Sequence, residues 1–304
     1  MKRFHRIGGG FLLSISIPLA AGCGTPDRTL RGDPSASSVV THASIADRAA
    51  CSSLCQCKQP LEPMCKAVAG MGFRYVDLSA LGWAPHIHVG DLVKDFDKEA
   101  SRVEAALKAN GLRVSNLTFD AIEGRPWDVY QTQFAALVKL AARLKTRLIN
   151  IMAPAVNCDR QEMAGKLRTL VAIAQREGVR LSVETHCNQI TERPADALWM
   201  CRQVPGLGLT LDPSHYFAGP NQGAPSDELY PYVYGTGFRA GSMNWATIQM
   251  PWGTGPIPFD SIVRKLQDAG YTGYYVAEYI EGFNKLDTLT ESRKFLQWAK
   301  AFGR

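Results

Sequence analysis

Short apolar runs alternate with longer segments of helical periodicity from about residue 49 to the end of the sequence. The short runs predict β-strands, and apolar residues that recur every three or four positions predict amphipathic helices. We expect strands at 49–54, 73–78, 112–119, 147–152, 181–184, 207–211, 233–239 and 274–278. We expect helices at 61–71, 95–109, 126–144, 161–177, 196–201, 259–269 and 286–302.

Alternation of this kind predicts parallel strands that are joined by crossover helices. Eight strand–helix units over about 250 residues fit a (β/α)8 TIM barrel. A doubly wound open sheet is the alternative, but no glycine-rich phosphate-binding fingerprint follows the first predicted strand. The pattern therefore favours the barrel.

Acidic residues stand where three of the predicted strands stop. Glu184 ends one apolar run and is followed by His186, and Asp212 ends the next run and is followed by His215. Glu278, in the segment YYVAEYIEG, repeats the pattern a third time. Because groups at the carboxyl ends of parallel strands form the ligand site of such folds, we expect these carboxylates to meet. The alternative for each acid taken singly is a helix cap or a loop residue.

Carboxylates that converge at one barrel mouth repel each other, so they either share protons or bind a cation. Oxygen ligands with at most one imidazole suit Mn²⁺ or Mg²⁺ better than Zn²⁺. An ion on neighbouring sugar oxygens would polarise a carbonyl and stabilise an enediolate. One carboxylate would then act as the base at the C–H bond and another as the acid.

The first 23 residues predict a targeting segment. Basic residues in the first six positions precede an apolar run at 11–21, and the segment AAGC that ends at Cys23 resembles a lipobox, where Cys23 would be lipidated. Residues 24–47 are rich in Gly, Pro, Ser and Thr and predict a flexible tether, which leaves 48–304 as the barrel domain. We therefore expect an exported protein, either a periplasmic or an outer-membrane-anchored lipoprotein. Plain secretory cleavage is the alternative.

Net charge gives no argument for a nucleic-acid partner. The formal charge is +6, and three of these positive charges lie in the predicted leader. The remaining +3 is spread over a large domain without a basic run that contains interleaved aromatics. Seven cysteines follow Cys23, and the cluster at 51–65 lacks the paired spacing of a zinc knuckle, so one disulfide or free thiols remain the alternatives there.

A family resemblance rests on four segments in order: VETH at 183–186, LTLDPSHY at 209–216, WGTGPIPF at 252–259 and GYTGYYVAEY at 270–279. These segments resemble the xylose-isomerase-like TIM barrels. That superfamily contains sugar phosphate isomerases and epimerases and the endonuclease IV type of DNA-repair enzyme. The resemblance covers residues from about 49 to the C-terminus.

In the epimerases of that superfamily, Glu, Asp, His and Glu from strands five to eight hold a divalent metal. The resemblance assigns three of these ligands to Glu184, Asp212 and Glu278 and the catalytic acid–base pair to Glu184 and Glu278. The fourth ligand belongs to a pattern like H-x-H-L-R-D in strand seven. There this sequence has glycine at 235 and 237 and alanine at 240, and it keeps only Arg239.

His215 resembles a histidine that contacts substrate oxygen, and it is also the candidate to replace the missing metal ligand. Other residues expected to contact substrate lie at predicted strand ends or in the loops that follow them: His86, His88, Asn116, His186, Arg239 and Trp252. Each has a plainer alternative. The histidines can be loop residues, Asn116 and Asn150 can satisfy each other, Arg239 can pair with an acid, and a loop tryptophan can pack.

We hypothesise an exported sugar isomerase or epimerase that removes a proton α to a carbonyl through a metal-stabilised enediolate. A lyase or hydratase of 3-keto-glycosides needs the same proton abstraction and is a close alternative. A non-catalytic carbohydrate-binding barrel without metal is the rival from another class, and Gly235 and Gly237 motivate it. The expected partner in each case is a small sugar or sugar derivative, with no nucleic acid.

Overall fold

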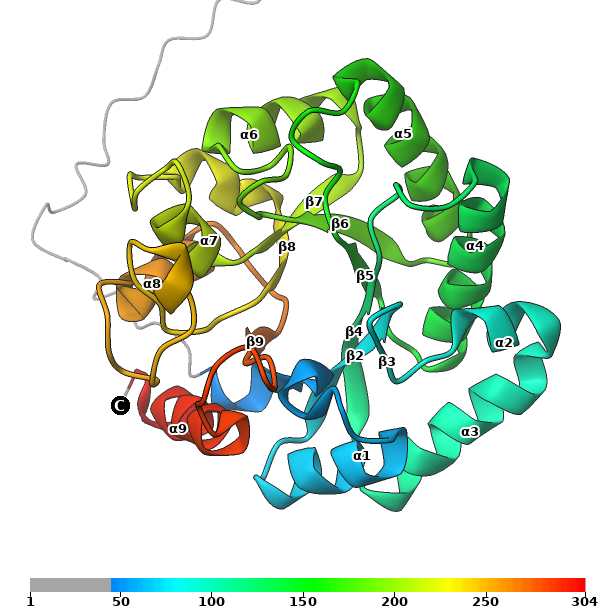
Figure 1. The fold of residues 1–304 in the computed structure, drawn as a ribbon, viewed down its shortest axis with the longest axis horizontal. Helices are drawn as coiled ribbons and strands as arrows, with labels where there is room; N and C mark the ends of the chain where they lie inside the picture. The colour runs from blue at the N-terminus through cyan, green and yellow to red at the C-terminus, as the bar shows by residue number, and fades with distance from the viewer. Residues whose placement is uncertain (1–44, 304) are drawn as a thin grey trace, which may run out of the picture. The chain divides into compact units, whose positions relative to one another are not determined.

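The computed structural model describes residues 45–303, and in this part of the chain the predicted barrel is confirmed (Figure 1). The strands lie at the centre, and the helices form a ring around them. The parallel strands of the barrel are β1 (Ala49–Ser52), β2 (Tyr75–Leu81), β4 (Arg113–Phe119), β5 (Leu148–Ile151), β6 (Arg180–Glu184), β7 (Leu207–Leu211), β8 (Val233–Thr236) and β9 (Tyr275–Ala277). A short strand, β3 (Ala84–Pro85), pairs antiparallel with β2.

Neighbouring strands pair in the order β8-β7-β6-β5-β4-β2-β1-β9. The ends of this series meet through a parallel bridge between Phe238 and Ala277. The Phe238 amide donates to the Val276 carbonyl at 2.7 Å, and the Glu278 amide donates to the Phe238 carbonyl at 2.9 Å. Strand β8 is therefore shorter than the predicted run at 233–239, and its continuation closes the barrel beside Glu278.

The helices of the outer ring match the predicted segments closely, and additional short helices lie in loops where no periodicity could develop. The α-helices are α1 (Leu61–Gly70), α2 (Val89–Lys94), α3 (Phe96–Ala109), α4 (Trp127–Arg143), α5 (Arg160–Arg176), α6 (Pro194–Gln203), α7 (Pro213–Ala218), α8 (Phe259–Asp268) and α9 (Thr288–Ala301). The 3-10 helices are η1 (Ala46–Arg48), η2 (Ser53–Gln56), η3 (Asp227–Tyr232) and η4 (Trp245–Thr247).

Helix starts follow from local side-chain chemistry. Asp95, Asp159 and Asp287 each accept hydrogen bonds from backbone N–H groups of the first turn of α3, α5 and α9, respectively. These groups have no partner within the helix, so an aspartate at the cap satisfies them. The apolar faces of the helices are buried against the strands, and Tyr130 and Phe134 of α4 are fully buried. The core thus lies between the barrel and the helix ring.

The folded domain begins slightly before the predicted boundary at residue 48. Ile45 is fully buried and η1 follows it, so the last residues of the expected tether pack on the barrel domain. The predicted leader, Cys23 and the rest of the tether lie outside the described residues. None of the helices in residues 45–303 is long and apolar enough to cross a membrane. The cysteines in this range are free thiols, with the sulfurs of Cys51 and Cys55 3.6 Å apart.

Candidate active site

The three acids predicted from strand ends are brought to one cluster. Glu184 is the last residue of β6, Asp212 directly follows β7, and Glu278 directly follows β9. Asp212 is fully buried, and the side chains of Glu184 and Glu278 are only 6% and 14% exposed. Nε2 of His215 lies between two of the acids, 3.7 Å from Oε1 of Glu184 and 3.5 Å from Oδ2 of Asp212.

The sequence Asp-Pro-Ser-His explains the position of Asp212 and His215. Oδ1 of Asp212 accepts the backbone N–H of Ser214 at 2.8 Å, which caps α7. Pro213 occupies the first turn, where its missing N–H and fixed φ suit a helix start. His215 then lies three residues after Asp212, on the same side of the helix. The backbone N–H of Asp212 donates to Oγ1 of Thr185 at 2.9 Å and ties this turn to the end of β6.

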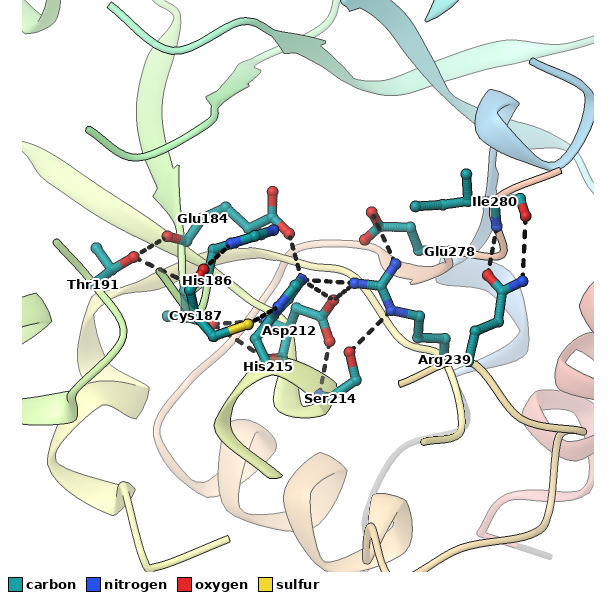
Figure 2. Close-up of polar contacts among 12 residues, drawn as sticks. Glu184, His186, Cys187, Thr191, Asp212, Ser214, His215, Arg239, Glu278 and Ile280 are labelled. Atoms are coloured by element: carbon teal, nitrogen blue, oxygen red, sulfur yellow. Dashed lines mark hydrogen bonds and ion pairs between the residues drawn. The ribbon is translucent and has the colours of Figure 1, made fainter. Parts of the chain in front are cut away.

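The guanidinium group of Arg239 lies at the centre of the cluster (Figure 2). Its Nη2 is 2.8 Å from Oδ2 of Asp212 and 2.7 Å from Nε2 of His215, and its Nε donates to Oγ of Ser214 at 2.9 Å. On the other side, Nη1 lies 4.0 Å from Oε1 of Glu278. The residue predicted to contact substrate or to pair with an acid therefore pairs mainly with Asp212.

The environment of His215 fixes its protonation state. A guanidinium can only donate, so Nε2 of His215 must accept from Arg239. The ring proton then lies on Nδ1, which is 3.1 Å from Sγ of Cys187. The ring of His186 packs against His215 with centroids 3.6 Å apart. Burial lowers the pKa of His215 well below its ordinary value and that of His186 to about 4, so both rings are neutral at pH 7.

The carboxyl groups of the cluster hold protons more tightly than ordinary acids. Burial, together with the charges of Glu278 and Asp212, raises the pKa of Glu184 well above its usual value. Burial raises the pKa of Glu278 to about 8, although Arg239 opposes this shift. A single permanent cation cannot neutralise three buried carboxylates, so protonated and ionised carboxyls coexist near pH 7. A protonated carboxyl group can act as a general acid and an ionised one as a general base, so both functions are available in one site.

A fourth acid, Asp77, lies inside the barrel on β2. Its Oδ1 accepts hydrogen bonds from Nδ2 of Asn116 at 2.7 Å and from Oγ1 of Thr118 at 2.8 Å. Burial raises the pKa of Asp77 to about 6. Asn116, predicted to contact substrate, is thus bound to Asp77, and its suggested partner Asn150 faces Ser182 instead. Sequence reasoning missed Asp77, although it is recognisable as a lone acid within the apolar run YVDLS.

Three residues that were predicted to contact substrate have other contacts in the structure. His86 is buried and bonds through Nε2 to the carbonyl of Gln59, because its loop folds back onto the chain before α1. His88 is exposed and precedes α2, with its backbone N–H donating to Glu99. Trp252 is 9% exposed and packs in an aromatic cluster with Phe259, Phe295 and Trp298. These contacts give His86 and Trp252 packing roles, and the predicted substrate contacts of the three residues stay predictions.

Trp245 is a further candidate functional residue, and in the sequence it is only one of several tryptophans in predicted loops. It is 45% exposed, and its ring lies 5.8 Å from that of His215 and 6.2 Å from that of His186. The exposed Phe283 meets it edge-on at 6.3 Å. An exposed aromatic face beside a buried polar cluster is a surface on which a sugar ring or an apolar substituent can stack. Only the fold brings Trp245 to the histidines.

A family model described as xylose isomerase-like TIM barrel matches residues 65–299. The chain belongs to this family. No curated protein matches the chain in sequence.

Solved structures with the same fold share few residues with this member of the xylose isomerase-like family. A xylose isomerase-like TIM barrel protein from Mycobacterium smegmatis in complex with magnesium is 19% identical, with a TM-score of 0.66 over 82% of this chain and 92% of that one. The 3-keto-D-glucoside 4-epimerase YcjR from E. coli is 17% identical, with a TM-score of 0.62 over 84% and 99%. The probable 3-DHS dehydratase AsbF from Bacillus anthracis is 17% identical, with a TM-score of 0.63 over 82% and 97%.

Groups that can ligate a metal are present in this barrel. Glu184, Asp212 and His215 offer ligand atoms within 4.8 Å of one another, and His186, Cys187 and His215 do the same. However, Oδ2 of Asp212 and Nε2 of His215 both bind Nη2 of Arg239. Two of the donor atoms that a divalent ion would use therefore face a cation already, and the present arrangement does not fit the metal predicted from the resemblance.

Proposed function

We propose that this barrel is a sugar isomerase or epimerase that removes a proton from a carbon α to a carbonyl group. The observation that carries the proposal is that Glu184 and Glu278 border one buried cluster: Glu278 lies 4.0 Å from Nη1 of Arg239, and Glu184 lies 3.7 Å from the His215 ring that Arg239 contacts. Strands β6 and β9 are separated by β7 and β8 in the barrel, so the two glutamates reach the cluster from different sides (Figure 2). A substrate bound between them would present one carbon to two carboxyl groups.

The proposed chemistry follows from these groups. The ionised glutamate takes the proton of the substrate C–H bond, and the electron pair moves onto the carbonyl oxygen to form an enediolate. The guanidinium of Arg239 is a permanently charged donor in a low-dielectric site, where it stabilises the developing negative charge strongly. The protonated glutamate returns a proton to carbon, and the two glutamates exchange roles when the reaction runs backwards.

The mouth of the site supports a carbohydrate substrate. The neutral His186 and His215 can accept or donate hydrogen bonds to hydroxyl groups without adding charge. Trp245 and Phe283 offer an aromatic face beside them. Similar barrels include a 3-keto-D-glucoside 4-epimerase and a D-psicose 3-epimerase, and these sugar-converting neighbours support the same class of substrate here.

A lyase or hydratase acting on 3-keto-glycosides is the second candidate, and the exposed aromatic pair favours it. Proton removal by one glutamate would be the same, but the enolate would then expel the substituent on the next carbon. The C–O bond to that group breaks, and the protonated glutamate gives its proton to the leaving oxygen. Trp245 and Phe283 would hold the apolar part of the leaving group.

Export remains a proposal that rests on the first 23 residues. Growth of the producing cells with a radiolabelled fatty acid tests it. Label on the protein that disappears in the Cys23→Ala variant supports a lipid anchor, and an unlabelled protein or label that survives in the variant rejects it.

Exchange of substrate hydrogen with solvent tests the proposed function. The protein is incubated in D₂O with a panel of ketoses and 3-keto-glycosides, and NMR follows deuterium entering the carbon α to the carbonyl. We expect wash-in with the wild type and a decrease of about a hundredfold or more in Glu184→Gln and Glu278→Gln. New vinylic signals would identify the lyase, and epimer signals would identify the isomerase.

Glu177→Gln is the matched control, because Glu177 is exposed at the end of α5 and lies outside the cluster. It should exchange at the wild-type rate. Wild-type rates in both site variants, or no exchange with any sugar while sugars still raise the melting temperature, would reject the enzyme and favour the non-catalytic carbohydrate-binding barrel.

A further inference from the structure

The seventh strand position of the barrel carries no side chain at Gly237, and the carboxylate of Glu278 lies in the space beside it. The family pattern places a histidine where this chain has Gly237. A Cβ atom added at Gly237 would lie 2.0 Å from Oε2 of Glu278, which is closer than any real contact. The carboxylate of Glu278 therefore fills the space that the first atoms of a ligand side chain would need.

Arg239 occupies the space between the remaining ligand-type groups. Its Nη2 lies within 2.8 Å of Asp212 and 2.7 Å of His215, its Nε bonds Ser214, and its Nη1 faces Glu278. Its side chain is only 4% exposed. Each outward face of the guanidinium thus has an acceptor or a negative charge. This set of partners binds and positions a cation that cannot lose its proton.

A divalent ion and this guanidinium cannot use the same atoms. Oδ2 of Asp212 and Nε2 of His215 would have to release Nη2 before they could bind an ion. The released guanidinium would then be a buried cation beside a second cation, which is strongly unfavourable. Oδ1 of Asp212 is engaged as well, because it caps α7. The contacts in this structure therefore favour the side-chain cation, Arg239, over an ion.

We propose that Arg239, which in the family pattern accompanies a metal-binding histidine, takes the place of the divalent ion in this barrel, so that the cluster of Glu184, Asp212, His215 and Glu278 is a metal-independent site organised by its own side-chain cation. Metal binding, and not turnover, tests which cation fills the site, so a negative result here is distinct from failure of the proposed reaction.

The experiment compares metal binding by the wild type and by an Arg239→Met variant. Met keeps much of the length and apolar stem of arginine but frees Asp212 and His215. After purification without chelator, metal content is measured by mass spectrometry, and melting temperature is recorded with Mn²⁺, Mg²⁺ or Zn²⁺ and with EDTA. We expect no stoichiometric metal and no metal-dependent shift for the wild type. We expect one bound Mn²⁺ or Zn²⁺ and a rise in melting temperature for Arg239→Met.

The variant Arg239→Met/Asp212→Asn locates the gained ion, because it should lose the shift if the ion sits in this cluster. Arg143→Met is the matched control, since Arg143 pairs with Asp97 and Glu104 on the helix surface. One equivalent of metal in the wild type with a metal-dependent melting temperature would overturn the proposal. So would a folded Arg239→Met protein that gains no ion. If that variant does not fold, the wild-type metal content decides by itself.

Discussion

Nη2 of Arg239 lies 2.8 Å from Oδ2 of Asp212, and both side chains are almost completely buried. Such a pair costs desolvation free energy on both sides, and removing one partner leaves a buried charge without compensation. The same contact fixes the orientation of the guanidinium toward His215. Stability and chemistry therefore depend on the same two residues.

Asp212→Asn should lower the free energy of unfolding by about 3 kcal/mol, because Arg239 would remain buried with a weaker partner. Urea denaturation measures this change. Asp97→Asn is the control, since Asp97 pairs with Arg143 on the surface and should cost less than about 1 kcal/mol. In a double-mutant cycle, Arg239→Met combined with Asp212→Asn should be less destabilising than the sum of the two single changes. Strict additivity would show that the pair is not coupled.

The two tryptophans 245 and 252 should respond in opposite ways to alanine substitution. Trp252→Ala removes a buried ring from the cluster with Phe259 and Trp298 and should cost about 3 kcal/mol or more of stability. Trp245→Ala should leave stability nearly unchanged but raise KM for the sugar substrate about tenfold, through loss of stacking. Thermal denaturation and steady-state kinetics on both variants check this. Equal losses of stability would contradict the placement of Trp245.

Asp77 should make the protein less stable as pH rises through the acidic range. Burial raises its pKa to about 6 from an ordinary value of 3.8. The folded state therefore favours the protonated acid, so no penalty exists below pH 3.8, and the full penalty of about 3 kcal/mol is present above pH 6.

Asp77→Asn cannot titrate at this position. The melting temperature of Asp77→Asn minus that of the wild type should be higher at pH 7.5 than at pH 4.5. Differential scanning calorimetry measures this difference. An exposed acid, Glu62 of α1, serves as the control in the variant Glu62→Gln. A difference between Asp77→Asn and the wild type that does not change with pH would refute the shifted titration.

Cys187 should resist alkylation in the native protein despite its contact with His215. Burial raises the pKa of its thiol to about 12, and the neutral His215 ring supplies no positive charge to stabilise a thiolate. Because the thiolate is the reactive form, iodoacetamide at pH 8 should label Cys187 only after unfolding. Peptide mass spectrometry measures the labelling. The partly exposed Cys158 provides the comparison within the same chain. Rapid labelling of Cys187 would indicate an activated nucleophile.

The sequence by itself determined the barrel and the acids at its rim. Alternation of apolar runs and helical segments encodes local structure, and parallel strands must place their carboxyl ends at one edge. Glu184, Asp212 and Glu278 could be found in this way because each directly follows a strand. These three acids come close together because the sheet closes into a barrel, and the conformation of the loops is not needed to bring them together.

Only the tertiary structure decided which cation the acids surround and which loop residues belong to the site. From the sequence, Arg239 could pair with any acid or bind substrate. The structure places its guanidinium beside Asp212 and His215. Trp252 and Trp245 both lie in predicted loops, so the sequence does not distinguish them. In the structure, Trp252 packs against Phe295 of α9, whereas Trp245 lies beside His215. Loops and side-chain rotamers are set by long-range packing, so residues far apart in the chain decide where these side chains lie.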